Sequence, residues 1–300
     1  MARSAYRSYP VQVRAVEPLT PSFVRVRFGS EELADLGWDG PDQRIKVIVP
    51  LPGTGLATFP AGEDWYAAWR LLPEEARNPI RTYTIRRADP LARELVVDFV
   101  AHGDAGPASR WLGEAIVGDQ VLVIAPDATS GEDGGGYEWR PGRATTLLLA
   151  GDETAVPAIA AILESLPAEA TGAAFLEVPL ARDRLDLAAP DGVAVTWLPR
   201  DGVPVPPPHG ELLDRAVRAW ADGVLTVDRH ADTTPPPLPA TDEELVWDAP
   251  APPQDPGLYA WIAGEAGVVT GLRRYLVRDL GVDRSRVAFM GYWRLGRAEN

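Results

Sequence analysis

Two hydrophobic periodicities divide the chain, and one replaces the other near its middle. In roughly the first 126 residues, short runs of β-branched and aromatic residues are separated by Pro, Gly and Asp, which is typical of antiparallel strands. The predicted strands are Pro10–Val16, Ser22–Phe28, Gln43–Val49, Arg81–Arg86, Leu95–Ala101 and Gln120–Ala125. Such strands with one short helix favour an antiparallel Greek-key β-barrel, because closure leaves no sheet edge unpaired.

The second half alternates apolar strands with helices. Ser130–Gly142, with three consecutive glycines at its centre, is typical of a flexible connection, so we place the domain boundary between residues 142 and 143. The strands expected beyond it are Thr145–Ala150, Ala173–Val178, Val193–Leu198, Leu258–Ala263 and Arg286–Met290, and the helices are Ala155–Leu166, Glu211–Ala221 and Val268–Leu280. This order predicts a parallel sheet covered on both faces: an α/β nucleotide-binding domain over 143–300 that follows a β-barrel domain over 1–142.

Two segments interrupt these patterns. Leu51–Asn78 contains four aromatic residues and a short predicted helix at Asp64–Arg70; its aromatic side chains either pack the loop itself or form a lip over a ligand pocket. Arg229–Pro256 contains eight prolines, which forbid a regular helix or a central strand. We interpret it as an extended excursion, since no third domain follows it.

The composition excludes several classes of function. The net charge of −14 and the pI of about 4.7 argue against nucleic acid or an anionic membrane as a partner, because both are bound by clustered cations. The sequence has no cysteine, so redox chemistry would need a bound organic cofactor. The three histidines, His102, His209 and His230, lack metal-ligand spacing, so no metal site is expected. The absence of a long apolar run favours a cytoplasmic protein without membrane insertion.

Candidate chemistry begins at Arg81. On the strand that starts there, Arg81 and Tyr83 share one face and Thr84 lies on the other. The next strand leads to Gly106 and Pro107, which mark a helix start. The exposed amides of the following residues, Ala108 and Ser109, would form an anion site, with Arg81 as the opposing cation. The ring of Tyr83 could lie against a flat cofactor.

These residues resemble a known signature. Arg81-x-Tyr83-Thr84 followed by His102-Gly103-Asp104-x-Gly106-Pro107-Ala108-Ser109-x-Trp111 is similar to the flavin-binding motif of siderophore-interacting proteins. These are ferric-siderophore reductases in the ferredoxin-reductase-like superfamily. The resemblance continues through Gly151–Ala158, Ala260–Gly267 and Gly291–Arg294, and so covers nearly the whole chain.

The resemblance implies a flavoenzyme with non-covalent FAD in the barrel. Arg81 and the amides of Ala108 and Ser109 would hold the pyrophosphate, Tyr83 the ring or ribityl chain, and Thr84 the flavin N5. His102 and Gly106 belong to the same cofactor-binding set. NAD(P)H on the α/β domain, or a ferredoxin instead, would supply electrons that the flavin passes singly to Fe(III) in a siderophore.

Lys46 is the only lysine in the chain. If Ile45, Val47 and Val49 face the core, Lys46 points outward. From composition alone it could be an ordinary solvated lysine. The resemblance implies instead a place in the basic pocket that receives the ferric siderophore.

A second site is expected at Gly151–Pro157, which follows the first strand of the α/β domain without the Gly-x-Gly-x-x-Gly fingerprint. Asp152 or Thr154 could cap the next helix, and the resemblance implies that this turn lies beside the nicotinamide, with Thr154 near hydride transfer. Glu177 at the end of the next strand suits the ribose hydroxyls of NADH. Arg182 and Arg184 could instead meet the extra phosphate of NADPH or be surface charges; we favour NADH.

The end of the chain carries a further aromatic group, Tyr292-Trp293-Arg294. These residues could shield the flavin edge or bind the iron complex, with Arg294 as a substrate-binding cation, or they could only anchor the tail. Gly264–Gly267 is explained by a helix cap. Two other functions stay open: a flavin reductase or diaphorase with another acceptor, and a non-enzymatic carrier of siderophore or flavin.

Overall fold

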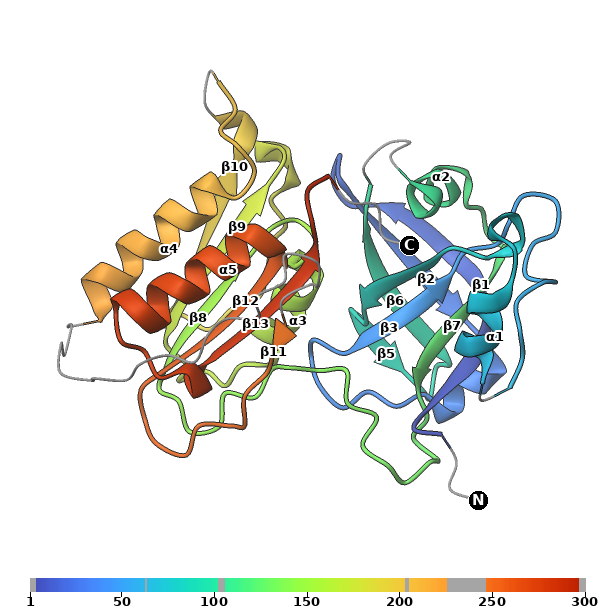
Figure 1. Cartoon of the computed structure of the whole chain (residues 1–300), viewed down its shortest axis with the longest axis horizontal. Helices are drawn as coiled ribbons and strands as arrows, with labels where there is room; N and C mark the ends of the chain where they lie inside the picture. The colour runs from blue at the N-terminus through green and yellow to red at the C-terminus, as the bar shows by residue number, and fades with distance from the viewer. Residues whose placement is uncertain (1–3, 63, 102–105, 203–204, 226–246, 297–300) are drawn as a thin grey trace. The chain divides into compact units, whose positions relative to one another are not determined.

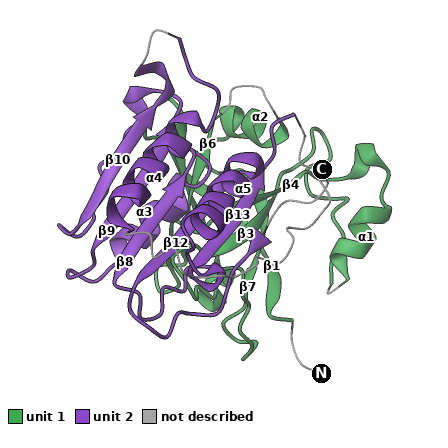
Figure 2. Cartoon of the chain, turned by 60° about the vertical axis from the view of Figure 1, so that its left-hand side comes forward, with its two compact units in different colours: residues 1–137, 300 green, residues 138–299 purple. Residues whose placement is uncertain are grey.

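The computed structural model describes residues 4–62, 64–101, 106–202, 205–225 and 247–296. The chain divides into two compact units, of which unit 1 ends at Tyr137 and unit 2 begins at Glu138 (Figure 2). Among the described residues, no helix combines the length and the apolar character needed to cross a membrane. Each unit has its own sheet and its own core.

Unit 1 is built on one curled antiparallel sheet (Figure 1). Its strands in the described residues are β1 Tyr6–Pro18, β2 Phe23–Gly29, β3 Arg44–Ile48, β4 Ile80–Thr84, β5 Arg87–Asp89, β6 Glu94–Val100 and β7 Gln120–Pro126. They lie in the order β4-β3-β7-β1-β2-β6-β5. Strands that follow each other in sequence, such as β2 and β3, are therefore not always neighbours, as a Greek-key order requires.

The sheet curls until β4 approaches β6, although the described strands do not form a fully paired barrel. β4 and β5 stand at the ends of the strand order, and β4 contacts β6. Just past β4, the Arg86 amide donates to the Val96 carbonyl at 2.9 Å. The expected barrel is thus a half-barrel that is tied by this bond beyond the end of β4.

The core of unit 1 follows the predicted alternation. On β3, Ile45 and Val47 are fully buried and Lys46 is exposed. The short helices are α1 Trp65–Leu71 and α2 Pro107–Glu114, with single helical turns at Glu31–Asp35 and Glu74–Ala76. Trp111 of α2 stacks on the buried Phe28 with the ring centroids 6.5 Å apart, so α2 is anchored by its aromatic side.

The glycines near the end of unit 1 have a structural role that the sequence did not predict. The Tyr6 hydroxyl and the Gln43 side-chain amide both donate to the Gly135 carbonyl, at 3.1 and 2.9 Å. Gly136 has a φ of 76°, and a side chain there would come within 2.2 Å of the Tyr6 hydroxyl. Glycine is therefore required for close approach to the sheet, and not only for flexibility.

Unit 2 is an α/β sheet (Figure 1). Its described strands are β8 Thr146–Gly151, β9 Gly172–Val178, β10 Val193–Pro199, β11 Trp247–Asp248, β12 Leu258–Glu265 and β13 Val287–Trp293. Their order is β10-β9-β8-β12-β13-β11, parallel except for the short β11. Because the chain runs outward from β8 through β9 to β10 and then returns to β12, the direction of winding reverses between β8 and β12, which is where such sheets bind ligands.

Helices cover both faces of this sheet. The helices are α3 Val156–Ser165, α4 Glu211–Val224 and α5 Ala266–Arg274, and α5 continues as a π-helical turn over Tyr275–Asp279; shorter turns lie at Ala181–Asp183, Arg200–Gly202 and Arg284–Arg286. α4 and α5 pack together on one face, and α3 lies on the other (Figure 1). The predicted β plus α/β architecture is therefore confirmed.

Leu95→Ala should lower the free energy of unfolding of unit 1 by about 2–5 kcal/mol, because it deletes a fully buried side chain and leaves a cavity. Leu91→Ala is the matched control: this leucine is 97% exposed, and its loss should change stability by less than about 0.5 kcal/mol. Urea unfolding followed by circular dichroism compares the two. Equal shifts would contradict the placement of Leu95 in the core.

Candidate functional site

The two halves of the motif at Arg81 and Gly106 meet in unit 1 around one buried ring. The Tyr83 ring on β4 lies 4.3 Å from that of Phe99 on β6, and Trp111 of α2 lies 5.9 Å from the same ring. Phe99 is 1% exposed. The core thus brings β4 and the start of α2 together, although they are distant in sequence.

The start of α2 is formed by a glycine, which leaves the first turn without a side-chain cap. Gly106, the N-cap, is extended with a φ of −176° and gives no side-chain cap. A Cβ at Gly106 would meet no described atom within 4 Å. No side chain caps the first turn of α2, which contains Ala108 and Ser109, and uncapped helix N-termini are the kind of site that binds anions. His102 lies outside the described residues.

The remaining motif residues stand on β4. Arg81 is half-buried, and its Nη1 donates to the Ile80 carbonyl at 2.8 Å. Thr84 is 6% exposed and pairs with Arg44 of β3. Arg81 and Tyr83 alternate with Thr84 along the strand, so a cation and a ring share one side of β4 and the threonine hydroxyl is on the other.

A cavity of about 580 Å³ opens on unit 1 beside β3 and β4. Its polar and aromatic lining includes Tyr6, Arg7, Arg44, Lys46, Trp65 and Asp127. The Lys46 Nζ donates to the Thr82 hydroxyl at 2.7 Å, so neighbouring strands fix the ammonium group. Three cations against one carboxylate make the cavity suited to an anionic ligand.

The sequence predicted only part of this cavity. Lys46 points outward as expected, and Trp65 lines the cavity, which agrees with the lip that was one of the two alternatives for its loop. Arg44 was missed, although it lies two residues from Lys46 and must share its face. Arg7 was also missed, because its approach depends on the pairing of β1 with β7, which no local pattern encodes.

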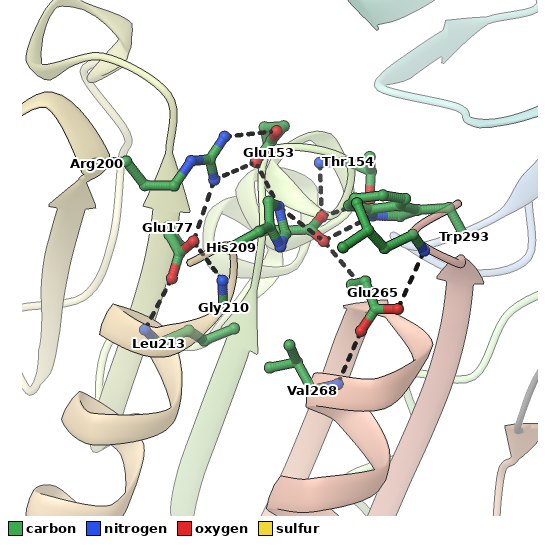
Figure 3. A network of polar contacts seen from close by, with 12 residues as sticks. Glu153, Thr154, Glu177, Arg200, His209, Gly210, Leu213, Glu265, Val268 and Trp293 are labelled. Atoms are coloured by element: carbon green, nitrogen blue, oxygen red, sulfur yellow. Dashed lines mark hydrogen bonds and ion pairs between the residues drawn. The ribbon is translucent and has the colours of Figure 1, made fainter. Parts of the chain in front are cut away.

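In unit 2, a network of polar groups gathers where the parallel strands end (Figure 3). Asp152, just after β8, is 1% exposed and accepts four hydrogen bonds. The Thr154 amide and hydroxyl donate to its Oδ1 at 2.9 and 2.5 Å, and the Glu265 amide and Trp293 Nε1 donate to its Oδ2, both at 2.8 Å. One carboxylate therefore joins the ends of β8, β12 and β13.

The backbone at Gly264 leaves room for the Asp152 carboxylate that links these strand ends. Gly264, with a φ of 140°, lies so close that a side chain would come within 2.6 Å of Asp152 Oδ2. Neither Asp152 nor Thr154 caps α3, which was one expectation: the N-cap is Ala155, without a side-chain bond. Glu265 does cap α5, because its Oε2 accepts from the Gly267 and Val268 amides at 2.7 and 3.0 Å.

Arg200 connects two further buried carboxylates. Its guanidinium donates to both oxygens of Glu153, at 2.9 and 3.0 Å, and to Glu177 at 3.1 Å (Figure 3). Burial by itself would raise the pKa of Glu153, but attraction to His209 and Arg200 outweighs it and holds the pKa at about 2. Glu153 is therefore ionised throughout the physiological range.

The structure assigns Glu177 a role that differs from the expected one. It is fully buried, and its carboxylate accepts from the Gly210 and Leu213 amides, at 2.7 and 2.9 Å, in addition to Arg200. Glu177 therefore holds the start of α4, and no carboxylate oxygen is exposed to a ribose. The position of Glu177 at the end of its strand suggested a ligand-binding residue. Its burial, and its bonds to amides at the start of α4, could not be predicted because α4 lies far along the sequence. Arg182 and Arg184 are exposed.

His209 lies between the acids and the last strand. Its Nε2 is 3.4 Å from Glu153 Oε2 and 3.8 Å from Asp152 Oδ2, and its ring meets Trp293 edge-on at 4.9 Å. Burial alone would lower the pKa of His209, but the Glu153 and Asp152 carboxylates raise it above its ordinary value. Burial raises the pKa of Asp152, and the charge of Glu153 adds to this rise.

The end of the chain is fixed to this network on both sides of Arg294. Trp293 is bound to Asp152, and the Leu295 amide donates to Glu265 Oε1 at 3.2 Å. Tyr292 stacks on Trp247 with the ring centroids 5.9 Å apart. The tail is thus anchored, as one alternative held, and Arg294 is held half-buried between two bonded neighbours.

Comparison with known proteins gives matches to both units. Residues 12–130 match the family described as "Siderophore-interacting FAD-binding domain", and residues 144–296 match the family described as "Siderophore-interacting protein". The ferric vibriobactin reductase of Vibrio cholerae is 29% identical over 301 residues, which cover 100% of this chain and 94% of the relative.

Solved structures agree with these matches. A siderophore utilization protein from T. fusca is 32% identical, with a TM-score of 0.71, and the match covers 98% of this chain and 95% of that one. A ferredoxin NADP+ reductase from Neisseria gonorrhoeae with bound FAD and NADP is 13% identical, with a TM-score of 0.58 and coverage of 96% and 99%. This second likeness is one of fold alone.

Glu177→Gln should lower the free energy of unfolding of unit 2 by about 3–5 kcal/mol, because it breaks a buried ion pair and turns an amide donor toward the α4 amides. Glu211→Gln is the matched control: its side chain is 45% exposed and 3.9 Å from Arg215, so the change should be below about 1 kcal/mol. Urea unfolding measures both. A stable Glu177→Gln protein with a raised KM for NADH would contradict the capping role.

Proposed function

The chain belongs to the siderophore-interacting protein family, and we propose that it reduces ferric siderophores in the cytoplasm, with electrons that pass from NADH through FAD. One observation carries this proposal. β4 supplies Arg81 and Tyr83 to the flavin motif, and between them it supplies Thr82, which lines the cationic cavity and binds Lys46. Thr82 alternates with Arg81 and Tyr83 but shares its face of β4 with Thr84, so the proposed N5 contact of Thr84 and the substrate cavity lie on the same side of this strand.

The residues of unit 1 fit a dinucleotide. A helix start without a side-chain cap suits a pyrophosphate, and Arg81 would add the cation. Tyr83 would lie against the ring or ribityl chain, its rear face supported by Phe99, and the Thr84 hydroxyl would bond the flavin N5. When bound, FAD supplies the conversion of a two-electron hydride donor into single-electron steps.

The proposed donor site is the turn after β8. The bonds from Thr154 to Asp152 hold this turn at the point where the winding of the sheet reverses, and Thr154 would lie near the transferred hydride. Four carboxylates lie in this network, against Arg200 and His209 as described cations. This surplus of negative charge disfavours an additional phosphate, which is why we propose NADH rather than NADPH.

The cavity cations would hold the iron complex. Siderophores bind Fe(III) through hard oxygen donors and often form anionic complexes, which Arg7, Arg44 and Lys46 would attract. Reduction to Fe(II) lowers the charge of the metal and so weakens its attraction to the oxygen donors. Arg294 is proposed as a further substrate cation, fixed by the bonds of its two neighbours.

An anaerobic titration tests the proposal. Protein loaded with FAD should lose its yellow colour on addition of NADH, and ferric siderophore should restore it while a chelator traps Fe(II). If a reduced ferredoxin bleaches the protein and NADH does not, NADH is not the electron donor, but the proposed reductase activity stands. Reoxidation by free flavin and not by ferric complexes would replace the reductase with a flavin reductase.

Arg81→Ala should weaken FAD binding about ten- to hundredfold, because a charge-assisted bond to the pyrophosphate is worth about 1.5–3 kcal/mol. Fluorescence titration of the FAD-free protein measures the Kd. Arg87→Ala is the control, since this side chain is 61% exposed and pairs only with Glu94 among the described residues; its Kd should stay within about twofold of wild type. Equal affinities in both variants would contradict the role of Arg81.

Lys46→Ala should slow reduction of the ferric complex about tenfold, through loss of about 1.4 kcal/mol of electrostatic attraction, and leave the reduction of FAD by NADH unchanged. Stopped-flow measurement separates the two half-reactions. Arg27→Ala removes a cation that does not line the cavity and is 3.9 Å from Glu17, so both half-reactions should be normal. If Lys46→Ala slows both half-reactions equally, Lys46 does not act on the substrate.

A further inference from the structure

The acidic network of unit 2 has an unusual charge balance. Asp152, Glu153 and Glu177 are at most 4% exposed, and the nearest described cations are Arg200 and His209. Arg200 divides its single charge between Glu153 and Glu177. Asp152 therefore depends on His209 for electrostatic compensation, with the imidazole nitrogen 3.8 Å from its Oδ2.

Asp152 is also the group through which His209 can act at a distance. Its four hydrogen bonds come from N–H and O–H donors on three segments, and all four require an ionised carboxylate for full strength. A positive charge at His209 stabilises this state and offsets the repulsion between Asp152 and Glu153. Without that charge, the repulsion between the two adjacent buried carboxylates is uncompensated, and the bonds that Asp152 accepts from Thr154, Glu265 and Trp293 weaken.

We propose that His209 is a positioning residue for hydride transfer: its protonated ring holds the Asp152 carboxylate in place, and Asp152 in turn holds the Thr154 turn and Trp293. The inference rests on the proposed function, since it gives Thr154 its place beside the nicotinamide. His209 itself does not touch the reacting atoms in this scheme. The edge-on contact of its ring with Trp293 gives it a second point of support.

The charged groups around His209 set the sign of its pH dependence. Asp152 and Glu153 after β8 and Arg200 after β10 act on it directly. Two further acids act through these groups: Glu177 on β9 pairs with Arg200, and Glu265 at the end of β12 donates its amide to Asp152. The pKa of His209 is raised in the folded protein, so its stabilisation is complete below the unfolded pKa and is lost as pH rises through the folded one. Hydride transfer should therefore be faster on the acid side of this transition.

The matched variants are His209→Gln and Arg215→Gln. Glutamine at 209 keeps an N–H donor toward Glu153 but carries no charge at any pH. Arg215→Gln removes an equal charge from a 73% exposed site on α4, where the effect on the network should be small. A difference between the two variants is then caused by the location of the charge at His209 and not by the change in net charge.

Nuclear magnetic resonance of the full chain tests the positioning without catalysis. Only three histidines contribute ring signals, and the one missing in His209→Gln is that of His209. We expect the Trp293 indole N–H and the Thr154 amide to shift with the same midpoint as His209 in wild type and in Arg215→Gln, and to lose this transition in His209→Gln. Signals that titrate identically in all three proteins would overturn the proposal.

Stopped-flow reduction of FAD-loaded protein by NADH gives the second readout. In wild type and Arg215→Gln the rate constant should fall about tenfold as pH rises through the His209 midpoint, which corresponds to about 1.4 kcal/mol. His209→Gln should be about tenfold slower on the acid side, independent of pH, with the Kd for NADH within about threefold. The wild-type pH profile in His209→Gln would overturn the proposal.

Failure of the donor assignment gives a different result. If NADH does not reduce the wild-type protein at any pH, Thr154 has no part in hydride transfer from NADH and the catalytic part of the proposal is overturned. The resonance titration still decides whether His209 positions Asp152, because it needs no electron donor. Loss of folding in His209→Gln would appear as loss of dispersed signals, and His209→Asn, which places its amide near the Nδ1 position, then replaces it in the same comparison.

Discussion

Compensation of buried carboxylates is the constraint on which unit 2 depends. Ionised side chains are costly to bury unless cations and hydrogen-bond donors surround them, and three lie at the strand ends of this sheet. Each is compensated from several segments: Glu177 by α4 amides, Glu153 by Arg200, and Asp152 by donors from β12 and β13. The buried carboxylates therefore hold the ligand-facing edge of the sheet in place, although a ligand need not contact them.

In unit 1, apolar packing and not charge compensation positions the motif residues. Its sheet must bring β4 and α2 together without pairing them, and Phe99 does so by contact with both Tyr83 and Trp111. Aromatic contacts of this kind tolerate small shifts and impose few directional requirements. The polar groups of the motif do not contribute to this packing: Arg81 stands on the strand, and no side chain caps the start of α2. Apolar packing therefore sets the positions of the motif residues.

The sequence predicted most of the fold because periodicity is local. The alternation at Ile45, Lys46 and Val47 was sufficient to turn the lysine outward, and the apolar strands of unit 2 were found nearly at their observed bounds. The site was predicted only where a motif carried it. His209 was discarded as a metal ligand and given no other role, because its approach to Asp152 depends on how β10 and α4 return to the sheet edge. Glu177 was placed correctly on its strand, but its burial under α4 reversed the inference.

The distribution of charge explains how an acidic protein can serve an anionic substrate. A net charge of −14 repels an anionic complex at long range, but at physiological ionic strength exposed charges are screened beyond about 8 Å. The charges that line the cavity are Arg7, Arg44 and Lys46 against Asp127, and Arg7 also pairs with Asp35 and Glu32 behind the lining. The three acids at the sheet edge of unit 2, Asp152, Glu153 and Glu177, are buried and paired, so little of their charge acts outside that edge. Local arrangement, and not the sum of charges, therefore determines which ligands each unit can accept.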